Sequence, residues 1–322
     1  MKAIRLHETG GPEVLRLDDI ELPPPGPDEI RIRHTAIGVN FIDTYHRSGL
    51  YKLPLPSGIG SEAAGVVEAI GANVRTLIIG ERVAYVGAIG AYAEAANIPA
   101  WRAVKLPSNI SDEIAAAAML KGMTAQYLLK RTYSAKAGET ILAHAAAGGV
   151  GLILGQWARH LGVIAVGTVG SEEKRALALA NGYAHVFNSR TDDIPAQVRA
   201  LTKGVGVPVV YDSVGKDTFM ASLDCLAVRG LMVSFGNASG PVPPFDLPIL
   251  TAKGSLYITR PTLASYTRNA EEMQQTAADL FSVINSGAVK IAVHQRFKLA
   301  DARLAHEALH SRATTGATVL VL

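Results

Sequence analysis

The sequence predicts an α/β protein in which a doubly wound parallel sheet is joined to a second, mainly β part. Three observations support this prediction. From residue 138 onward, apolar strand-like runs alternate with amphipathic helical runs. Before residue 107, short β-branched runs with period-two patterning are separated by proline and glycine clusters. A glycine-rich run, residues 143–151, directly follows one of the apolar runs. Regular strand–helix alternation builds parallel sheets, whereas closely spaced short strands build antiparallel ones.

Length and composition exclude several classes of protein. The 322 residues exceed the usual length of one domain, so we expect two. Hydrophobic residues make up 48% of the chain and charged residues 18%, which supplies a core and excludes a disordered chain. The 31 basic and 28 acidic side chains give a net charge of +3 without a basic run. We therefore expect no nucleic-acid partner.

Cysteine usage and hydropathy favour a cytoplasmic protein. Cys225 is the only cysteine, which excludes an intramolecular disulfide and a multi-thiolate metal site. Residues 1–11 lack the apolar core of a signal peptide. The most apolar stretch, residues 140–158, is interrupted by His144, by glycines and by Gln156. We expect neither export nor membrane insertion.

The predicted elements follow in chain order. In the first part we expect strands at 29–34, 64–70 and 82–86, and then a helix at 112–129 that Ser111 caps. The parallel sheet is expected to contain strands at 140–145, 163–169, 184–188, 207–212, 231–235 and 255–258. Its helices are expected at 150–161, 172–181, 194–202 and 217–227. The tail pattern predicts a helix at 269–286, a strand at 289–297, a helix at 301–311 and an apolar end at 317–322 that rejoins the first part.

The glycine-rich run predicts a dinucleotide-binding turn. Ala146, Gly148 and Gly151 occupy the three places of the G-x-G-x-x-G pattern, so the first glycine is replaced. Small residues let the backbone approach a pyrophosphate, whose charge the amides and the dipole of the following helix stabilise. Gly149 and Val150 belong to the same turn. The alternative is close helix-to-strand packing without a ligand.

The end of the second parallel strand favours NADPH over NADH. An NAD site would place an acidic residue there to bind the ribose 2′-hydroxyl. This chain has Gly170 and Ser171 instead, with Lys174 one helical turn later, which suits a 2′-phosphate. The alternative is that Lys174 is an ordinary exposed helix lysine.

The carboxyl ends of later strands complete the expected cofactor edge. Ligands of open parallel sheets bind outside these ends, so backbone near Val214, Phe235 and Gly236 is expected to face the ribose and nicotinamide. For the side chain of Asp212, an ordinary strand-to-helix turn is an equally good interpretation.

Six segments form a characteristic set: GGPEV (10–14), AIGVNFIDTY (36–45), SGLY (48–51), LKGMT (120–124), the 145–151 turn and ITRP (258–261). Together they resemble the zinc-independent, zeta-crystallin-like NADPH:quinone oxidoreductases of the medium-chain dehydrogenase/reductase superfamily. The resemblance runs from about residue 2 to the C-terminus. It implies a homodimer in which a GroES-like catalytic domain (1–122 and 263–322) flanks a Rossmann NADPH-binding domain (123–262).

The resemblance also implies a set of cofactor contacts. A tyrosine expected near the 2′-phosphate is replaced by Ser189, and the adjacent Arg190 could supply charge there. Arg312 would bind a phosphate from the tail. The remaining implied contacts are Asn40, Phe41, Ile42, Asp43, Thr44, Tyr45, Thr124, Tyr127, Gly148, Gly149, Val150, Gly151, Gly170, Ser171, Lys174, Val214, Phe235 and Gly236.

No metal site is expected. Zinc-dependent relatives would have a cysteine in the 40–45 segment and Gly-His-Glu where this chain has Gly60, Ser61 and Glu62. The nine histidines show no ligand spacing, and His46 beside Tyr45 is the one that needs checking.

The predicted reaction is zinc-independent reduction of quinones by electron or hydride transfer from NADPH. An easily reduced acceptor needs hydrogen-bond donors for its developing oxyanion but no Lewis acid. We expect Tyr45 and Asn40 to orient the acceptor, and Asp43 to fix the cofactor or its loop. The alternatives are an NADPH-dependent reductase of α,β-unsaturated carbonyls and a non-catalytic NADPH-binding structural or RNA-associated protein.

Overall fold

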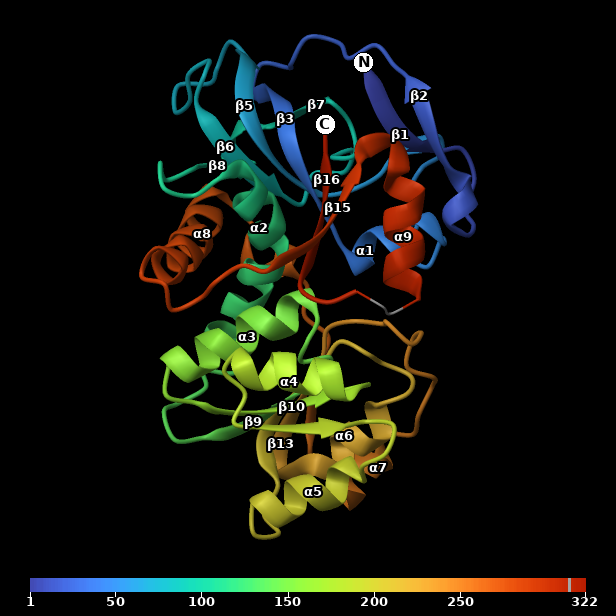
Figure 1. The fold of residues 1–322 in the computed structure, drawn as a ribbon, viewed down its shortest axis with the longest axis vertical. Coiled ribbons are helices and arrows are strands. Elements are labelled where there is room, and N and C mark those ends of the chain that lie inside the picture. The colour runs from blue at the N-terminus through green and yellow to red at the C-terminus, as the bar shows by residue number, and fades with distance from the viewer. Residues whose placement is uncertain (312–313) are drawn as a thin grey trace. The chain divides into compact units, whose positions relative to one another are not determined.

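The computed structural model describes residues 1–311 and 314–322, and the chain divides into two units (Figure 1). Unit 1 contains residues 1–123, 267–285 and 291–322, and unit 2 contains residues 124–266 and 286–290. The first boundary falls within helix α2 (Asp112–Tyr127). No helix of the described chain is both long and apolar enough to cross a bilayer.

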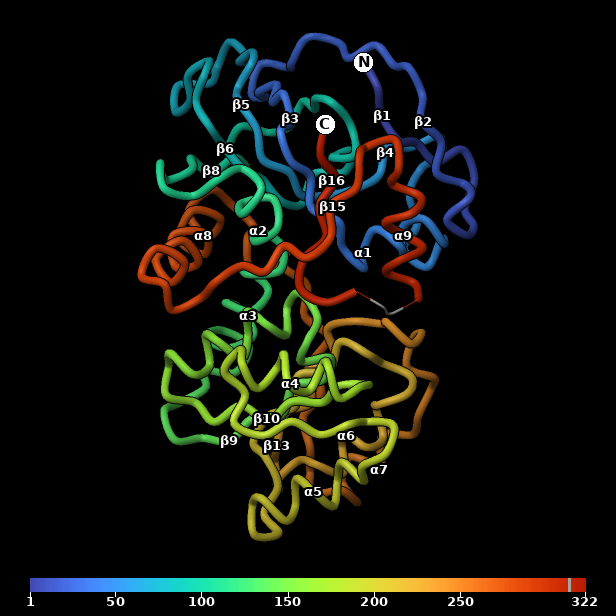
Figure 2. The backbone as a smooth tube through the Cα atoms, in the orientation of Figure 1, coloured from blue at the N-terminus to red at the C-terminus, as the bar shows by residue number. Residues whose placement is uncertain are grey.

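Unit 1 is mainly β. Its strands are β1 (Lys2–Leu6), β2 (Leu15–Asp19), β3 (Glu29–Val39), β4 (Ser57–Gly58), β5 (Glu62–Ile70), β6 (Arg82–Val86), β7 (Ala95–Pro99), β8 (Ala103–Lys105), β15 (Val293–Lys298) and β16 (Ala317–Val321). Besides the start of α2, its helices are α1 (Phe41–Arg47), α8 (Ala270–Asn285) and α9 (Ala302–His310). Strand β3 pairs antiparallel with β5, β7 and β16, so the last strand of the chain lies beside one of the first (Figure 2). Alternate residues of β3, among them Ile30 and Ile32, are buried in the core of this unit.

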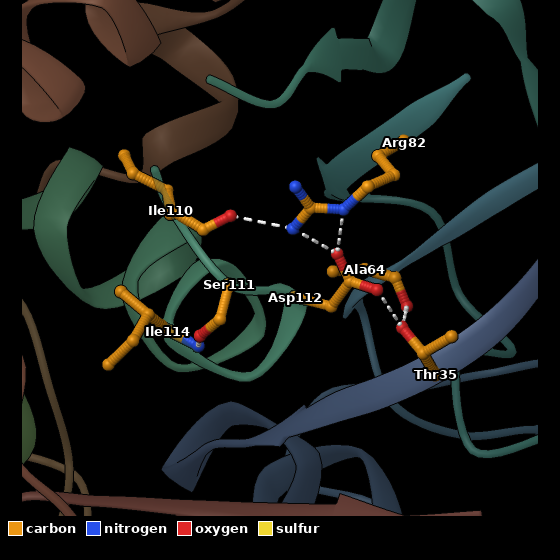
Figure 3. Close-up of polar contacts among 7 residues, drawn as sticks. All are labelled: Thr35, Ala64, Arg82, Ile110, Ser111, Asp112 and Ile114. Carbon is orange, nitrogen blue, oxygen red and sulfur yellow. Dashed lines mark hydrogen bonds and ion pairs between the residues drawn. The ribbon is translucent and has the colours of Figure 1, made fainter. Parts of the chain in front are cut away.

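The start of helix α2 is held in unit 1 by several side-chain hydrogen bonds (Figure 3). As predicted, Ser111 caps the helix, because its Oγ accepts a hydrogen bond from the Ile114 amide at 3.2 Å. Asp112 Oδ1 accepts from the Arg82 guanidinium at 2.6 and 2.8 Å, and Oδ2 accepts from the Thr35 hydroxyl at 2.7 Å. These contacts fix the start of α2 on β3 and β6, with the acid placed favourably for the helix dipole.

Unit 2 confirms the predicted doubly wound sheet. Its strands are β9 (Thr140–Ala143), β10 (Ile164–Val169), β11 (His185–Asn188), β12 (Val207–Asp212), β13 (Leu226–Ser234) and β14 (Tyr257–Thr259). They run parallel in the order β11-β10-β9-β12-β13-β14. The helices are α3 (Gly149–His160), α4 (Glu172–Ala180), α5 (Ile194–Leu201), α6 (Phe219–Cys225) and α7 (Pro248–Ala252). Figure 1 shows α3 and α4 on one face of the sheet and α5 and α6 on the other.

Several predicted boundaries were wrong, among them the ends of the strands predicted at 29–34 and 289–297, and three in the middle of the chain lie beside irregular backbone. Strand β9 ends at Ala143 rather than at 145, because Ala145 adopts a left-handed conformation with φ of 54° and turns the chain. Strand β13 begins five residues earlier than predicted and contains an irregularity near Arg229, whose φ is 59°. Helix α2 ends at Tyr127 and continues as a π-helical segment, Leu128–Thr132.

Candidate functional site

The glycine-rich turn after β9 opens helix α3. Gly148 takes the N-cap position, and Gly149 and Val150 begin the helix. An ideal Cβ on Gly151 would lie 2.4 Å from the carbonyl oxygen of Ala145, so only glycine fits there. The turn therefore brings the first amides of a 12-residue helix close to the strand end. Helix amides presented in this way are a general type of phosphate-binding site.

The replaced first glycine of the pattern is compensated on the neighbouring strand. Ala146 is fully buried, and its amide donates to the Thr168 carbonyl of β10 at 3.0 Å. An ideal Cβ on Gly167 would lie 2.6 Å from the Ala146 methyl group. Because Gly167 has no side chain, the Ala146 methyl group fits against β10 and the tight turn is preserved.

The turn after β10 has an arginine side chain beside it. Gly170 and Ser171 connect β10 to α4, and Ser171 Oγ accepts from the Lys174 amide at 3.4 Å as the helix cap. The Arg190 guanidinium lies beside Gly170, with its Nε 3.5 Å from the position of an ideal Cβ on that glycine. Lys174 belongs to the first turn of α4 together with Glu172 and Glu173, so side chains of both charges follow this turn, while no acidic residue ends the strand itself.

The Ser189 side chain bonds to the protein backbone, whereas the Arg190 side chain is exposed. The Ser189 hydroxyl donates to the Val169 carbonyl at 3.1 Å, so its hydrogen is used within the protein. Arg190 is exposed, and its backbone amide is fixed by Asn188 Oδ1 at 3.1 Å. At the place where the resemblance implies a tyrosine, this chain therefore offers a guanidinium.

The turns after β12 and β13 lie close to each other. The Phe235 amide donates to the Asp212 carbonyl at 2.8 Å, and an ideal Cβ on Gly236 would lie 2.4 Å from the Ser213 carbonyl oxygen. Arg260 Nη1 donates to the Ser234 and Gly236 carbonyl oxygens at 3.0 and 2.9 Å. Sequence reasoning used Arg260 only as part of the ITRP segment and missed this bracing role.

Unit 2 thus gathers most of its predicted site residues at one edge of the sheet. Strands β10, β9, β12 and β13 are adjacent, so the turns that contain Gly170, Gly148, Val214 and Phe235 follow neighbouring carboxyl ends. Thr124 and Tyr127 lie instead in the last turn of α2. The Tyr127 ring is buried and stacks on Tyr266 at a centroid distance of 4.5 Å.

In unit 1, residues 40–45 form the beginning of helix α1, which sequence reasoning did not predict. Asn40 precedes α1, and its amide donates to Asp43 Oδ2 at 2.8 Å. The Thr44 hydroxyl donates to the Phe41 carbonyl at 2.7 Å, and Ile42 is partly buried in the same turn. The half-buried Tyr45 ring meets Tyr51 edge-on at 5.4 Å.

The side-chain amide of Asn40 is held by two buried charged residues. Lys121 Nζ donates to Asn40 Oδ1 at 2.7 Å, and Asn40 Nδ2 donates to Glu62 Oε2 at 2.7 Å. Because lysine only donates and an ionised carboxylate only accepts, this pair fixes which end of the amide points which way. Glu62 Oε1 also accepts from the Leu120 amide at 2.6 Å, which ties the arrangement to α2.

Asp43 lies behind Asn40 and is completely buried. Its Oδ2 accepts from the backbone N–H of Asn40 and from the Tyr92 hydroxyl, the latter at 3.0 Å. Its Oδ1 has no hydrogen-bond partner among residues 1–311 and 314–322. Burial raises the pKa of this carboxyl to about 7, although the two donors and Lys121 oppose the shift. The Asp43 carboxyl group therefore joins the start of α1 to Tyr92 by hydrogen bonds.

The residues around Asn40 do not fit a zinc ion. Within the described residues, no group of three His, Cys, Asp or Glu side chains is placed to hold a metal. The Lys121 ammonium lies 3.5 Å from Glu62 Oε2 and already neutralises that carboxylate. His46 packs edge-on against Tyr51 at 6.0 Å, and burial lowers its pKa. Cys225, the only thiol, is buried.

Sequence reasoning therefore missed three residues of the unit 1 site: Glu62, Lys121 and Tyr92. Lys121 did give a signal, because it is the only lysine in the Ala- and Leu-rich 112–129 segment, and a charge inside an apolar helix needs a partner. Arg312, expected to bind a phosphate, lies outside the described residues.

Comparisons with known proteins cover the whole chain. A model for the alcohol dehydrogenase GroES-like domain matches residues 26–108, and a model for zinc-binding dehydrogenases matches residues 149–282. A quinone oxidoreductase of Pseudomonas aeruginosa is 54% identical over 99% of both chains. A 2-haloacrylate reductase of a Burkholderia species is 43% identical over 98% of this chain and 97% of its own.

Solved structures agree with these matches. The crystal structure of Escherichia coli quinone oxidoreductase complexed with NADPH has a TM-score of 0.99 and 50% identity, with 100% of both chains covered. These similarities confirm the predicted combination of a Rossmann sheet with a GroES-like, mainly β domain. With this identity over its full length, the chain belongs to the quinone oxidoreductases of the medium-chain, zinc-binding dehydrogenase family.

Proposed function

We propose that this protein reduces quinones with NADPH, without a metal ion. The observation that carries the proposal is the Arg190 guanidinium beside Gly170, where no acidic residue ends β10, in a chain about half identical, along its whole length, to quinone oxidoreductases. A guanidinium and an ammonium near Ser171 suit a 2′-phosphate. The absence of an acid at the end of β10 removes the group that NADH would need.

The cofactor residues proposed in unit 2 divide by the part of NADPH that they bind. Gly148, Gly149, Val150 and Gly151 are assigned to the pyrophosphate, because helix amides stabilise its charge. Ser171, Lys174 and Arg190 are assigned to the 2′-phosphate. Backbone at Val214, Phe235 and Gly236 is assigned to the nicotinamide half. Ser189 acts through the backbone of its turn, since its hydroxyl hydrogen is already used.

Asn40 and Tyr45 are the residues proposed to orient the acceptor. Bound NADPH supplies a hydride from its nicotinamide ring. Asn40 Nδ2 carries two hydrogens, one of which goes to Glu62, so the second is available to an acceptor oxygen. Lys121 and Glu62 keep that N–H in one direction, which removes an orientation cost when the acceptor binds. Tyr45 is proposed to orient the acceptor with its hydroxyl group and with its ring, which packs edge-on against Tyr51.

The test is a panel of quinones with NADPH and NADH, run on the parent protein and on Arg190→Ala, Asn40→Ala and Tyr45→Phe. We expect quinone turnover with NADPH, and a loss of about tenfold in NADPH affinity for Arg190→Ala with little change for NADH. Asn40→Ala and Tyr45→Phe are expected to lower turnover by a larger factor than they weaken NADPH binding. A strong preference for NADH would overturn the cofactor assignment, and unchanged turnover in both variants would remove Asn40 and Tyr45 from the reaction.

A second candidate substrate class is α,β-unsaturated carbonyl compounds and acids. The 43% identity to a 2-haloacrylate reductase favours it, because an acrylate carries an activated carbon–carbon double bond. Hydride delivery to such a substrate also requires protonation at carbon. Product analysis with a quinone and an enone in the same assay separates the two reactions.

A cytoplasmic homodimer is part of the proposal. Strand β14 is an edge of the unit 2 sheet, so its outer backbone groups can pair with a second copy. Tyr257 on this strand is 60% exposed, and Val228 nearby is 73% exposed. Light scattering of the parent and of Tyr257→Lys tests the dimer, which the added charge is expected to weaken. The single buried cysteine fits a reducing compartment, and cell fractionation tests the location.

A further inference from the structure

A chain of buried hydrogen bonds crosses the sheet beneath the cofactor edge of unit 2. It is centred on His144, which follows β9 within the glycine-rich run and is 3% exposed. Its Nδ1 lies 2.8 Å from the Thr168 hydroxyl on β10, and its Nε2 lies 2.9 Å from the Ser222 hydroxyl on α6. The function proposed above gives this imidazole no role.

This chain of hydrogen bonds ends at Asp212, the last residue of β12. The Asp212 side chain is completely buried. The Ser222 hydroxyl donates to Asp212 Oδ2 at 2.8 Å, and the Thr218 hydroxyl donates to the same oxygen at 2.7 Å. Asp212 Oδ1 accepts from the Val214 and Gly215 amides at 2.7 and 3.0 Å. The carboxylate therefore fixes the turn that contains Val214.

Chemistry decides the direction of every hydrogen bond in the chain. The Asp212 carboxylate only accepts, so the single hydroxyl hydrogen of Ser222 goes to it. The Ser222 oxygen must then accept from His144 Nε2, which carries the ring proton. Burial lowers the pKa of His144 and keeps the ring neutral, so Nδ1 accepts from the Thr168 hydroxyl. No other arrangement satisfies all four groups.

The three strand ends that this chain connects precede three different parts of the proposed cofactor site. Thr168 comes two residues before Gly170, His144 comes four before Gly148, and Asp212 comes two before Val214. The imidazole is thus the link between the turn assigned to the 2′-phosphate and the turn assigned to the nicotinamide half. A shift of either turn would leave buried polar groups without partners, at a cost that binding would have to overcome.

We propose that His144 is a positioning residue that holds the turns after β9, β10 and β12 in register, and so sets the affinity for the intact NADPH molecule. The proposal rests on the proposed function only in that NADPH is the ligand. It assigns His144 no contact with the cofactor and no part in the hydride transfer.

The experiment compares NADPH binding with thermal stability in several variants. Thr168→Val and Ser222→Ala each remove one hydroxyl with little change in volume, and His144→Leu removes both contacts of the ring. Isothermal titration calorimetry gives the Kd for NADPH, and a melting curve gives Tm. We expect each variant to raise the Kd about five- to twentyfold. The Thr168→Val/Ser222→Ala double variant is expected to raise it less than the product of the two single effects, because either change interrupts the same chain.

Two controls separate positioning from plain stabilisation. Gln156 is buried in α3 and bonds the Leu152 and Lys290 backbone, away from the strand ends, so Gln156→Leu is expected to lower Tm while the Kd changes less than twofold. In His144→Gln the amide can accept from Thr168 and donate to Ser222, so it is expected to restore most of the affinity lost in His144→Leu.

Two results would overturn the proposal in distinguishable ways. If the parent binds NADPH and Thr168→Val, Ser222→Ala and His144→Leu lower Tm without raising the Kd, His144 only stabilises the fold and the proposed function stands. If the parent itself does not bind NADPH, both the positioning role and the proposed function fail. Should His144→Leu not fold, the two hydroxyl variants decide the question.

Discussion

Each unit contains a buried chain of a carboxylate, a hydroxyl and an imidazole, and the two chains end differently. In unit 1 the Tyr92 hydroxyl donates to Asp43 and lies 3.0 Å from His306 Nε2, while Arg47 donates to His306 Nδ1 at 3.3 Å. In unit 2 Ser222 and His144 take the places of Tyr92 and His306. Both carboxyl groups are completely buried, so burial alone does not distinguish them.

The difference lies in the number of donors. Within the described residues, Asp212 accepts from four donors, two on each oxygen. Asp43 accepts from two, both on Oδ2, and its Oδ1 is left without a partner there. Two donors do not offset the loss of hydration, so the pKa of Asp43 rises to about 7. Two hydrogen-bond chains built from the same three kinds of group can therefore differ in pH sensitivity, because their carboxyl groups accept from different numbers of donors.

The largest expected effect is a pH dependence of stability in unit 1. Because the pKa of Asp43 is raised, the folded state binds more protons than the unfolded state between about pH 4 and 7, and the free energy of unfolding falls as pH rises through that window. Asp43→Asn removes this slope. The difference in unfolding free energy, variant minus parent, is expected to grow by about 2–3 kcal/mol between about pH 5 and 7, and then to level off.

His306 provides the matched control with the opposite sign. Burial, assisted by the charge of Arg47, lowers the pKa of His306 to about 3, so the unfolded state binds more protons between about pH 3 and 6.5. The difference for His306→Gln, variant minus parent, should therefore fall as pH rises to about 6.5. Urea unfolding in a Trp157→Phe background leaves Trp101 of unit 1 as the only tryptophan reporter. A flat difference for both variants would contradict this account.

The next largest effect is expected from Asp212→Asn in unit 2. The amide nitrogen would replace one carboxylate oxygen and face the two donors that this oxygen accepts from, so two hydrogen bonds to a charged acceptor are lost. We expect the free energy of unfolding to fall by about 2 kcal/mol, as followed by Trp157 fluorescence in a Trp101→Phe background. Ser222→Ala, which removes a single donor, should cost about 1 kcal/mol. Equal losses from the two variants would show that the number of donors is not what stabilises this carboxylate.

The smallest effect is expected from Tyr92→Phe, which interrupts the unit 1 chain without changing its ends. Loss of the hydroxyl is expected to cost about 1 kcal/mol, because Asp43 and His306 each lose a buried partner. The hydrogen bond from Tyr92 lowers the pKa of Asp43, so its removal should extend the pH-dependent window above pH 7. If the pH range over which stability changes is the same in Tyr92→Phe and in the parent, the Tyr92 hydrogen bond does not lower the pKa of Asp43.

The unit 2 part of the site was largely predictable from the sequence. Gly148, Gly151 and Ser171 lie in local patterns, a strand followed by a glycine turn and a helix, and these patterns depend on residues close in the chain. Arg190 was visible only as a departure from the expected tyrosine. Helix α1 was not predicted, because FIDTYHR has no helical periodicity of its own and its start is fixed by the Asp43 carboxyl group.

The sequence by itself determined the fold class and the glycine turn and predicted NADPH as the cofactor, because each follows from periodicity or from residue types at short spacing. The tertiary structure alone decided which buried polar groups meet. His306 lies 214 positions from Tyr92 and 259 from Arg47, and Lys121 lies 81 positions from Asn40. No local pattern encodes such pairings. They arise because packing the sheets and helices leaves buried donors and acceptors whose only available partners come from distant parts of the chain.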